Sequence, residues 1–249
     1  TATCSFTVTV NDTQLPTIVC PANIVQANDL NSCGANVVYG TPVGLDNCPG
    51  SVTTLTAGLA SGSVFPIGVT SVTYLVTDAS ANTATCSFTV TVNDTQAPTI
   101  TCNAPITVSN DAGVCGAVVT YTNTSTDNCP GQVITQTAGL ASGSVFPIGT
   151  TTNTFVVTDA SGNTATCSFT VTVNDTELPT ITCNAPITVS NDAGVCGAVV
   201  TYTNTSTDNC PGQVITQTAG LASGSVFPIG TTTNTFVVTD ASGNTATCS

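Results

Sequence analysis

The clearest pattern along the chain is an alternation of apolar and hydroxyl-bearing residues. Residues 164–173 read TATCSFTVTV, in which every second position is apolar or Cys. A period of two residues predicts a β-strand with one buried and one solvated face. The buried face is expected to carry Ala165, Cys167, Phe169, Val171 and Val173.

Similar short runs predict several more strands in the same region. Residues 153–158 place Phe155 and Val157 on one face, and the turn sequence ASGN joins this run to the strand at 164–173 as a hairpin. Residues 115–121 align Cys115, Ala117, Val119 and Tyr121. Further strands are predicted at 98–102, 132–137 and 144–146. No segment has helical periodicity, so the sequence predicts an all-β protein built from antiparallel β-sandwiches of six or seven short strands each.

The whole pattern recurs along the chain. The sequence TATCSFTVTVND begins at Thr1, Thr83 and Thr164, and TATCS returns at Thr245. We therefore predict the last strand of a preceding repeat at 1–12, repeat 1 at 13–94, repeat 2 at 95–175, and repeat 3 at 176–249, truncated in its last strand. The chain is interpreted as a window of a longer array. Residues 1–10 are expected to belong to a preceding repeat; donation of this strand to a neighbouring subunit is the alternative.

Composition and charge exclude several classes of function. The chain has no Lys, Arg or His, and its 13 acidic residues give a net charge of −13. Without cationic side chains we expect no binding to nucleic-acid phosphates or anionic membranes, and no nucleophilic triad, hence no enzyme. No apolar run approaches the ~20 residues of a membrane helix, so no membrane insertion is predicted for this segment. Each carboxylate must be solvated, bonded to amides or bound to a metal ion.

Cysteines recur at four positions in each repeat, which is typical of disulfides in an extracellular, oxidising compartment. Two disulfides per repeat would offset the marginal core of so small a domain. The inward alternation of Cys115 and Cys167 predicts at least one bridge between the sheets, but the connectivity stays open. Zinc is disfavoured because there is no CxxC pair and no His. The predicted disulfide cysteines are Cys20, Cys33, Cys48, Cys86, Cys102, Cys115, Cys129, Cys167, Cys183, Cys196, Cys210 and Cys248.

A set of short motifs carries a family resemblance. PTITC, a Cys before GAVVTY, TDNCPG, GLASGSVFPIGTTT and FVVTDASGNTATCSFTVTVND together resemble the hyalin repeat, or HYR domain, over the whole chain. This resemblance implies immunoglobulin-like sandwiches in a linear tandem array, in large extracellular or cell-surface proteins associated with adhesion. Near-identical copies are similar to those of long bacterial adhesins or fibres. The implied partners are neighbouring repeats of the same chain and other copies in a fibre.

Acidic residues are expected to gather where one repeat follows another. In an immunoglobulin-like order, the DNC loop, the DASGN hairpin and the incoming linker lie at the same end of a repeat, and the SNDAG turn lies at the opposite end. Ca²⁺ takes about six to eight oxygen ligands and would lock such a junction. Alternatively, these residues only shape turns by accepting backbone N–H groups. The candidate Ca²⁺ ligands are Asn11, Asp12, Asp46, Asp78, Asn93, Asp94, Asp127, Asp159, Asn174, Asp175, Asp208 and Asp240.

Two functions remain after these exclusions. The first is a structural stalk or filament of an extracellular adhesin, stiffened by disulfides and by Ca²⁺ at the junctions. The alternative is a ligand- or carbohydrate-binding adhesion module that acts through repeat loops such as residues 138–143. The absence of Trp and an aromatic content of 5% leave few platforms on which a sugar could stack, which favours the first function.

Overall fold

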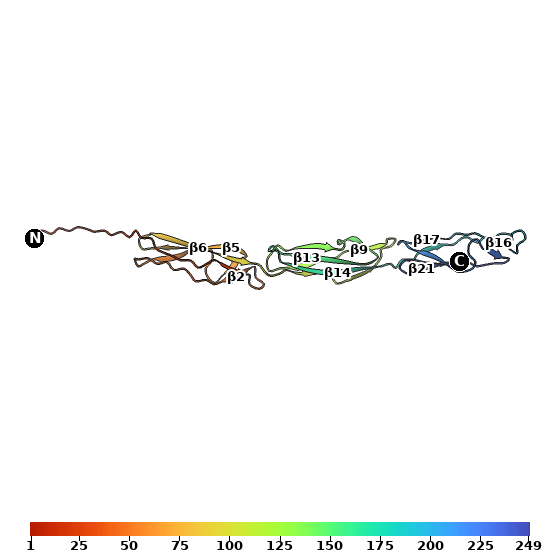
Figure 1. Cartoon of the computed structure of the whole chain (residues 1–249), viewed down its shortest axis with the longest axis horizontal. Coiled ribbons are helices and arrows are strands. Elements are labelled where there is room, and N and C mark those ends of the chain that lie inside the picture. Colours follow the sequence, from red (N-terminus) through yellow and green to blue (C-terminus); the bar gives the residue numbers. More distant parts are fainter. The chain divides into compact units, whose positions relative to one another are not determined.

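The computed structural model describes all 249 residues and contains strands but no helix (Figure 1). Repeat 1 contains β1 (Ile24–Ala27), β2 (Gly34–Val37), β3 (Val52–Ala57), β4 (Ser63–Pro66), β5 (Gly68–Thr77) and β6 (Thr83–Asn93). Repeat 2 contains β7 (Thr99–Thr101), β8 (Ile106–Ser109), β9 (Gly116–Val119), β10 (Thr124–Thr126), β11 (Val133–Ala138), β12 (Ser144–Pro147), β13 (Gly149–Thr158) and β14 (Thr164–Asn174). Repeat 3 contains β15 (Thr180–Thr182), β16 (Gly197–Val199), β17 (Thr205–Thr207), β18 (Val214–Ala219), β19 (Val226–Pro228), β20 (Thr235–Thr239) and β21 (Thr245–Cys248).

Repeat 1 is a two-layer sandwich. One layer is a four-stranded sheet in the order β1-β6-β5-β3, and the other contains the antiparallel pair β2-β4. In the larger sheet β5 runs antiparallel to β3 and β6, whereas β1 runs parallel to β6, with Ile24 opposite Val90. Repeat 2 repeats these orders as β11-β13-β14-β8 and β12-β9. The predicted immunoglobulin-like, antiparallel sandwich is confirmed, with a parallel edge strand that the sequence did not suggest.

Alternate residues of the strands form the core, as the period of two predicts. In β6, Phe88, Val90 and Val92 are almost fully buried, and the Phe88 ring packs edge-on against the Tyr39 ring at a centroid distance of 5.0 Å. The hydroxyl of Tyr39 donates a hydrogen bond to the Leu59 carbonyl at 2.6 Å, which satisfies a polar atom inside the apolar layer. The inward face predicted for residues 169, 171 and 173 of β14 is confirmed, since all three side chains are buried.

The interior position predicted for Cys115 is wrong. Cys115 is exposed because it lies before β9, in a turn where Gly113 has a φ of 71°, and the alternation of the strand does not extend that far. A disulfide between Cys102 and Cys167 instead joins the end of β7, in the two-stranded sheet β10-β7, to β14 in the four-stranded sheet. The predicted bridge between sheets therefore exists, with Cys102 as the partner.

The given sequence ends at Ser249, so it does not include the residues of repeat 3 that correspond to the second half of β6 and β14. The larger sheet of repeat 3 has three strands, in the order β18-β20-β21. Without that second half, Phe227 is partly exposed, although its counterparts Phe65 and Phe146 are fully buried.

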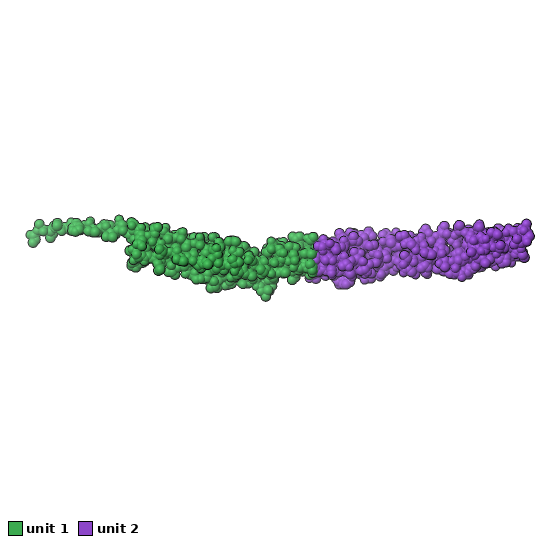
Figure 2. All heavy atoms as spheres, in the orientation of Figure 1, with its two compact units in different colours: residues 1–100, 125–135, 156–166 green, residues 101–124, 136–155, 167–249 purple.

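The chain divides into two compact units, and the boundary passes through repeat 2 (Figure 2). The first unit contains residues 1–100, 125–135 and 156–166, and the second contains residues 101–124, 136–155 and 167–249. Each passage from one repeat to the next therefore lies wholly inside one unit. No helix of sufficient length and hydropathy to cross a bilayer occurs in the chain.

Candidate functional site: the junctions between repeats

Five disulfides connect the chain, and two of them cross from one repeat to the next. Cys20–Cys86, Cys102–Cys167 and Cys183–Cys248 lie within repeats 1, 2 and 3. Cys33–Cys129 joins repeats 1 and 2, and Cys115–Cys210 joins repeats 2 and 3. Cys4, Cys48 and Cys196 carry free thiols, so the disulfides predicted for Cys48 and Cys196 are not formed within residues 1–249. Each repeat thus has one internal disulfide, and one further disulfide joins each pair of consecutive repeats.

The sequence contains a signal for this connectivity. Cys115 directly follows the SNDAG turn, whereas Cys129 belongs to the DNC loop, which is expected at the opposite end of the same repeat. Two cysteines at opposite ends of a sandwich cannot come within the ~4.4–6.8 Å between Cα atoms that a disulfide needs. The following repeat presents its own DNC cysteine to the SNDAG end, and the Cα atoms of Cys115 and Cys210 are 4.8 Å apart.

Three aspartates meet at the first junction, which comprises the end of repeat 1, the linker and the facing loops of repeat 2. Asp94 directly follows β6, Asp127 follows β10, and Asp159 follows β13. Carboxylate oxygens of all three residues lie within 4.8 Å of one another. The local sequence explains this gathering, because each aspartate is the first residue after a strand that ends at the junction: β6 of repeat 1, and β10 and β13 of repeat 2.

Backbone hydrogen bonds within the turns occupy only some of the carboxylate oxygens in this cluster. Asp94 Oδ1 accepts a hydrogen bond from the backbone N–H of Gln96 at 3.2 Å, and Asp127 Oδ2 accepts one from the backbone N–H of Cys129 at 3.1 Å. The second carboxylate oxygens, Asp94 Oδ2 and Asp127 Oδ1, are buried without any partner, and so is Asn128 Oδ1. Buried acceptors without donors are costly, and three of them in one cluster form a donor set that suits a hard cation.

Asp159 is held in its ionised form by the DASGN hairpin. Burial raises the pKa of this carboxyl, but hydrogen bonds from the side chain of Asn163 and from the backbone N–H groups of Asn163, Ser161 and Gly162 outweigh burial and lower the pKa below its ordinary value. The pKa values of Asp78 and Asp240 are lowered for the same reasons in their own hairpins. Asn163 Nδ2 also donates to the Asp94 carbonyl at 3.1 Å, which ties the linker to the hairpin.

Two side chains reach across the first junction. Asn128 Nδ2 donates to the carbonyl of Ser32 at 3.0 Å and to Asp94 Oδ1 at 3.4 Å, so one amide contacts repeat 1, the linker and repeat 2. Gln96 and Asn31 form a reciprocal pair, in which the Asn31 backbone N–H donates to Gln96 Oε1 at 2.8 Å and Gln96 Nε2 donates to Asn31 Oδ1 at 3.1 Å.

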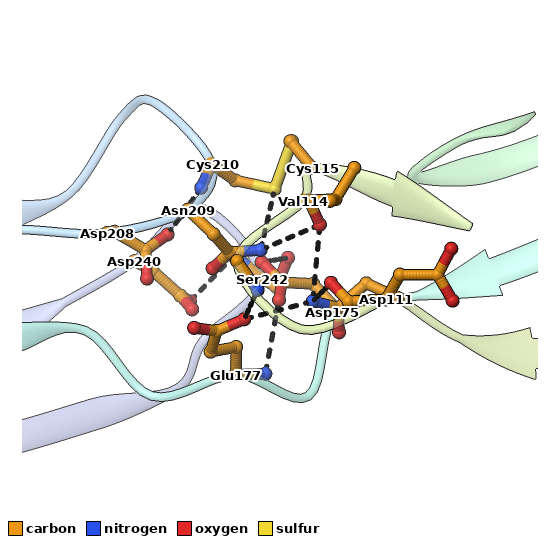
Figure 3. Close-up of a disulfide and its surroundings, with 12 residues drawn as sticks. Asp111, Val114, Cys115, Asp175, Glu177, Asp208, Asn209, Cys210, Asp240 and Ser242 are labelled. Carbon is orange, nitrogen blue, oxygen red and sulfur yellow. Dashed lines mark hydrogen bonds between the residues drawn. A yellow bond between two sulfur atoms is a disulfide. The ribbon is translucent and has the colours of Figure 1, made fainter. Parts of the chain in front are cut away.

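The second junction, between repeats 2 and 3, has the same plan (Figure 3). Asp175, Asp208 and Asp240 lie within 4.8 Å of one another, beside the Cys115–Cys210 disulfide. Asn209 Nδ2 donates to the carbonyl of Val114 at 3.1 Å. Asp208 Oδ1 and Asn209 Oδ1 are buried without partners, whereas Asp175 Oδ2 accepts a hydrogen bond from Ser242 Oγ at 3.2 Å.

Only some of the remaining predicted Ca²⁺ ligands lie close to one another. A third cluster contains Asp12, Asp46 and Cys48, and does not include Asp78. A hydrogen bond with Asp12 raises the pKa of the Cys48 thiol, and burial and the nearby carboxylates add to this increase. The side chains of Asn11, Asn93 and Asn174 are exposed. At the two junctions, the buried amide oxygens without a partner belong to Asn128 and Asn209 of the DNC loops.

Comparison with known proteins assigns the family. A family model described as "HYR domain" matches residues 11–92, 93–173 and 174–249. The chain belongs to the HYR domain family. Hyalin from Strongylocentrotus purpuratus is 37% identical to it over 97% of this chain and 21% of the relative. Hyalin from Lytechinus variegatus is 36% identical over 98% of this chain and 48% of the relative. The HYR repeats described above thus span between about a fifth and about half of these relatives.

Solved structures give a much weaker similarity. A "Protocadherin gammaB7 EC3-6 cis-dimer structure" covers 94% of this chain and 76% of that chain, with a TM-score of 0.35 and 16% identity. The "Crystal structure of human CDH23 EC21-23" covers 94% of this chain and 99% of that chain, with a TM-score of 0.34 and 15% identity. The description of the site therefore depends on the geometry of the HYR repeats themselves, whose five disulfides are those of an extracellular protein.

Proposed function

We propose that this chain is a structural segment, a stalk or filament, of an extracellular adhesion-type protein, and that each junction fixes one HYR repeat against the next. The observation that carries this proposal is the pair of disulfides that cross from repeat to repeat, Cys33–Cys129 and Cys115–Cys210. A recognition module would not need such bonds, because its loops act within a single repeat.

Two covalent connections at each junction have a mechanical consequence. Consecutive domains joined only by a linker are expected to move relative to each other. A second connection through the disulfide removes most of the rotations that a single linker permits. The bonds from Asn128 to Ser32 and from Asn163 to Asp94 restrict the same linker from the side. Load applied to one repeat is then transmitted to the next through two covalent paths.

We further propose that Ca²⁺ binds at both junctions. No cationic side chain exists in the chain to balance the carboxylates, and several buried oxygens of the residues that converge at each junction have no hydrogen-bond partner. The proposed ligands are Asp94, Asp127, Asn128 and Asp159 at the first junction, and Asp175, Asp208, Asn209 and Asp240 at the second. If Ca²⁺ binds only the folded junction, it raises the free energy of unfolding. The increase is about 2.7 kcal/mol when the concentration of free Ca²⁺ is 100 times Kd.

Calorimetry on the full chain tests the calcium proposal. Titration should give saturable Ca²⁺ binding, and scanning calorimetry should show a higher Tm with Ca²⁺ than with chelator. The double variant Asp127→Asn with Asp208→Asn should lose both effects. The matched control is Asp111→Asn with Asp192→Asn, because these aspartates also accept one backbone N–H each, from Val118 at 2.8 Å and Val199 at 2.9 Å, outside the clusters. Identical melting with Ca²⁺ and with chelator would contradict the proposal.

Small-angle X-ray scattering tests the structural role separately. Replacing both cysteines of a junction, as in Cys33→Ser with Cys129→Ser, should broaden the distribution of distances within the chain because the repeats gain freedom. Replacing the internal pair Cys102 and Cys167 by Ser is the control, since it leaves both junctions closed. If loss of the junctional pair left the distance distribution unchanged, the disulfide would not fix the repeats.

A further inference from the structure

At each junction, one residue separates a proposed Ca²⁺ ligand from a cysteine of the disulfide that crosses between repeats. In the DNC loop of repeat 2, Asp127 supplies a carboxylate, Asn128 an amide and Cys129 the sulfur. The backbone N–H of Cys129 donates to Asp127 Oδ2 at 3.1 Å, which closes the three residues into one turn. The ligand and the cross-link therefore belong to a single loop, and a displacement of one displaces the other.

The side chain of Asn128 contacts both the cross-link and the carboxylate cluster. Its Nδ2 donates to Cys129 Sγ at 3.4 Å and to Asp94 Oδ1 at 3.4 Å. It also donates at 3.0 Å to the carbonyl of Ser32, the residue directly before the other half of the disulfide, Cys33. Its Oδ1 is buried without a partner. One amide thus connects both sides of the disulfide to the proposed Ca²⁺ site.

The second junction repeats this arrangement (Figure 3). Asn209 Nδ2 donates at 3.1 Å to the carbonyl of Val114, directly before Cys115, and at 3.7 Å to Cys210 Sγ. The backbone N–H of Cys210 donates to Asp208 Oδ2 at 3.0 Å, and Asn209 Oδ1 is buried without a partner. Because the same contacts occur twice, they are a property of the junction and not of one site.

Repulsion between carboxylates acts on the cross-linked loop when no cation is bound. Carboxylate oxygens of Asp94, Asp127 and Asp159 lie within 4.8 Å of one another, and the chain has no cationic side chain. Asp94 is only 8% exposed and its Oδ2 has no hydrogen-bond partner, so water screens the repulsion poorly. The disulfide holds the loop of Asp127 in place against this repulsion. A divalent cation among these oxygens replaces repulsion by attraction and holds the same loop.

We propose that Ca²⁺ and the two junctional disulfides, Cys33–Cys129 and Cys115–Cys210, are coupled: bound Ca²⁺ protects each disulfide from reduction, and the closed disulfide raises the affinity for Ca²⁺. This inference rests on the proposed Ca²⁺ sites and adds their regulation. Linkage makes the two effects equal in size, and couplings between protein sites are typically about fivefold to 150-fold. A junction then closes fully only where free Ca²⁺ and an oxidising environment occur together.

The reduction of the first junctional disulfide by glutathione shows where Ca²⁺ acts. A glutathione thiolate attacks one sulfur of the Cys33–Cys129 bond, forms a mixed disulfide and releases the other cysteine as a thiolate. A second glutathione thiolate attacks the glutathione sulfur, releases the second cysteine thiolate and leaves as glutathione disulfide. Two electrons pass to the protein, and its two thiolates take up the two protons that glutathione gave up. Ca²⁺ is not consumed, and it favours the oxidised side because the freed loop no longer holds its ligands together.

A redox titration of the full chain measures the first half of this coupling. The chain is equilibrated with mixtures of reduced and oxidised glutathione, with saturating Ca²⁺ or with chelator, and its thiols are then blocked and mapped by mass spectrometry. Cys33 and Cys20 suit this measurement, because each lies in a sequence that occurs once in the chain. Reduction at Cys33 should become at least about fivefold less favourable with Ca²⁺. Reduction at Cys20, which belongs to the internal bond Cys20–Cys86, should not change.

Two variants show whether the effect passes through the proposed ligands. Asp127→Asn should make reduction at Cys33 independent of Ca²⁺. Asp111→Asn is the matched control, because Asp111 also accepts one backbone N–H, from Val118, but lies outside the clusters. This control should retain the full effect of Ca²⁺ on Cys33.

The reverse half of the coupling is measured by calorimetric titration with Ca²⁺. Cys33→Ser with Cys129→Ser should weaken Ca²⁺ binding at the first junction by a factor similar to the one found in the redox titration. Cys20→Ser with Cys86→Ser removes a disulfide that does not cross a junction, and should leave the affinity unchanged.

The outcomes separate this inference from the function proposed above. If calorimetry detects Ca²⁺ binding but reduction at Cys33 is the same with Ca²⁺ and with chelator, the coupling is wrong and the Ca²⁺ sites stand. An equal shift at Cys33 and Cys20 would also overturn the coupling, since it would mean that Ca²⁺ stabilises the fold as a whole. If no Ca²⁺ binds, the calcium proposal and the coupling both fail, whereas the disulfide-linked stalk is judged by scattering alone.

Discussion

The two junctions in this chain share their cross-link but differ in their polar contacts. Both have a disulfide, three clustered aspartates and an asparagine that reaches the preceding repeat. At the first junction, Gln96 and Asn31 bond reciprocally. At the second, Glu177 accepts hydrogen bonds from the backbone N–H of Gly113 at 2.8 Å and from Asn110 Nδ2 at 3.4 Å.

This difference distinguishes the features that both junctions share from the side-chain contacts that vary between them. Asn31 and Gly113 occupy equivalent positions with φ of 59° and 71°, and each offers its backbone N–H to the side chain two residues after the linker aspartate. A side-chain oxygen of Gln or of Glu can accept a hydrogen bond from that N–H equally well. The disulfide and the carboxylate cluster occur at both junctions without such a substitution, so we infer that they are the features a junction requires.

The largest expected effect comes from removing the cross-links one at a time. The loops closed by Cys33–Cys129 and Cys115–Cys210 have sequence separations of 96 and 95 residues, so the entropy that each removes from the unfolded chain is the same. Replacing either pair by Ser should lower the free energy of unfolding by about 2–4 kcal/mol. Scanning calorimetry of the two double variants measures this. Unequal losses, by more than about 1 kcal/mol, would show that the junctions are not mechanically equivalent.

The next effect concerns the affinity for Ca²⁺. Asp94 Oδ2 is free to bind an ion, whereas Asp175 Oδ2 accepts the Ser242 hydroxyl. We therefore expect tighter binding at the first junction. Ser242→Ala should raise the affinity of the second junction by about threefold to tenfold, because a hydrogen bond of ~0.5–1.5 kcal/mol no longer competes. Ser161→Ala, the equivalent change at the first junction, is the control in the same titration. Equal changes in both variants would refute this explanation.

Acid should affect both junctions alike. Asp159 and Asp240 have folded-state pKa values below the ordinary value of 3.8, so protonation favours the unfolded chain. The stabilisation they contribute is fully present above the unfolded-state pKa and is lost as the pH falls below about 4 through the folded-state pKa. Thermal melting between pH 6 and pH 2.5, with chelator, measures the loss. The variants Asp159→Asn and Asp240→Asn should each flatten this dependence to a similar degree.

The smallest effect should come from exchanging the linker residues. Glu177→Gln keeps an oxygen that accepts the Gly113 N–H, so stability should change by no more than about 0.5 kcal/mol. Gln96→Glu places a carboxylate oxygen opposite Asn31 Oδ1 and should cost about 0.5–1 kcal/mol, which Asn31→Gly should recover. Chemical denaturation of the single and double variants measures this coupling. Additive effects in the double variant would mean that residues 31 and 96 act independently.

The long alternating strands could be predicted from the sequence, and so could the short strand at 144–147, but two other short strands could not. The apolar face at 169, 171 and 173 follows from a period of two over ten residues. Ile106–Ser109 and Thr124–Thr126 were not predicted, and β8 pairs only along its parallel edge with β14. A parallel edge depends on a partner more than 60 residues away, which local sequence does not encode.

The junctions were only partly predictable for a different reason. The gathering of Asp94, Asp127 and Asp159 follows from topology, since Asp94 begins the linker that enters repeat 2 at the end where the loops of Asp127 and Asp159 lie. The cysteine pairing was left open, because a pattern of residue types alone does not distinguish a bond within a repeat from one to its neighbour. The signal that could have decided it is the expected position of Cys115 and Cys129 at opposite ends of one repeat, which excludes a bond between them. Asn93 and Asn174 have exposed side chains at the ends of strands, and their role as ligands stays a prediction.

The overlap of the disulfide loops gives the chain tolerance to cleavage. Cys33 lies inside the loop closed by Cys20–Cys86, Cys102 lies inside the loop closed by Cys33–Cys129, and the remaining loops overlap in the same manner as far as Cys248. Every peptide bond between Cys20 and Cys248 is therefore bypassed by at least one sulfur bridge. A protease that nicks one exposed loop there would leave the two fragments attached, and the damaged molecule would still bear tension.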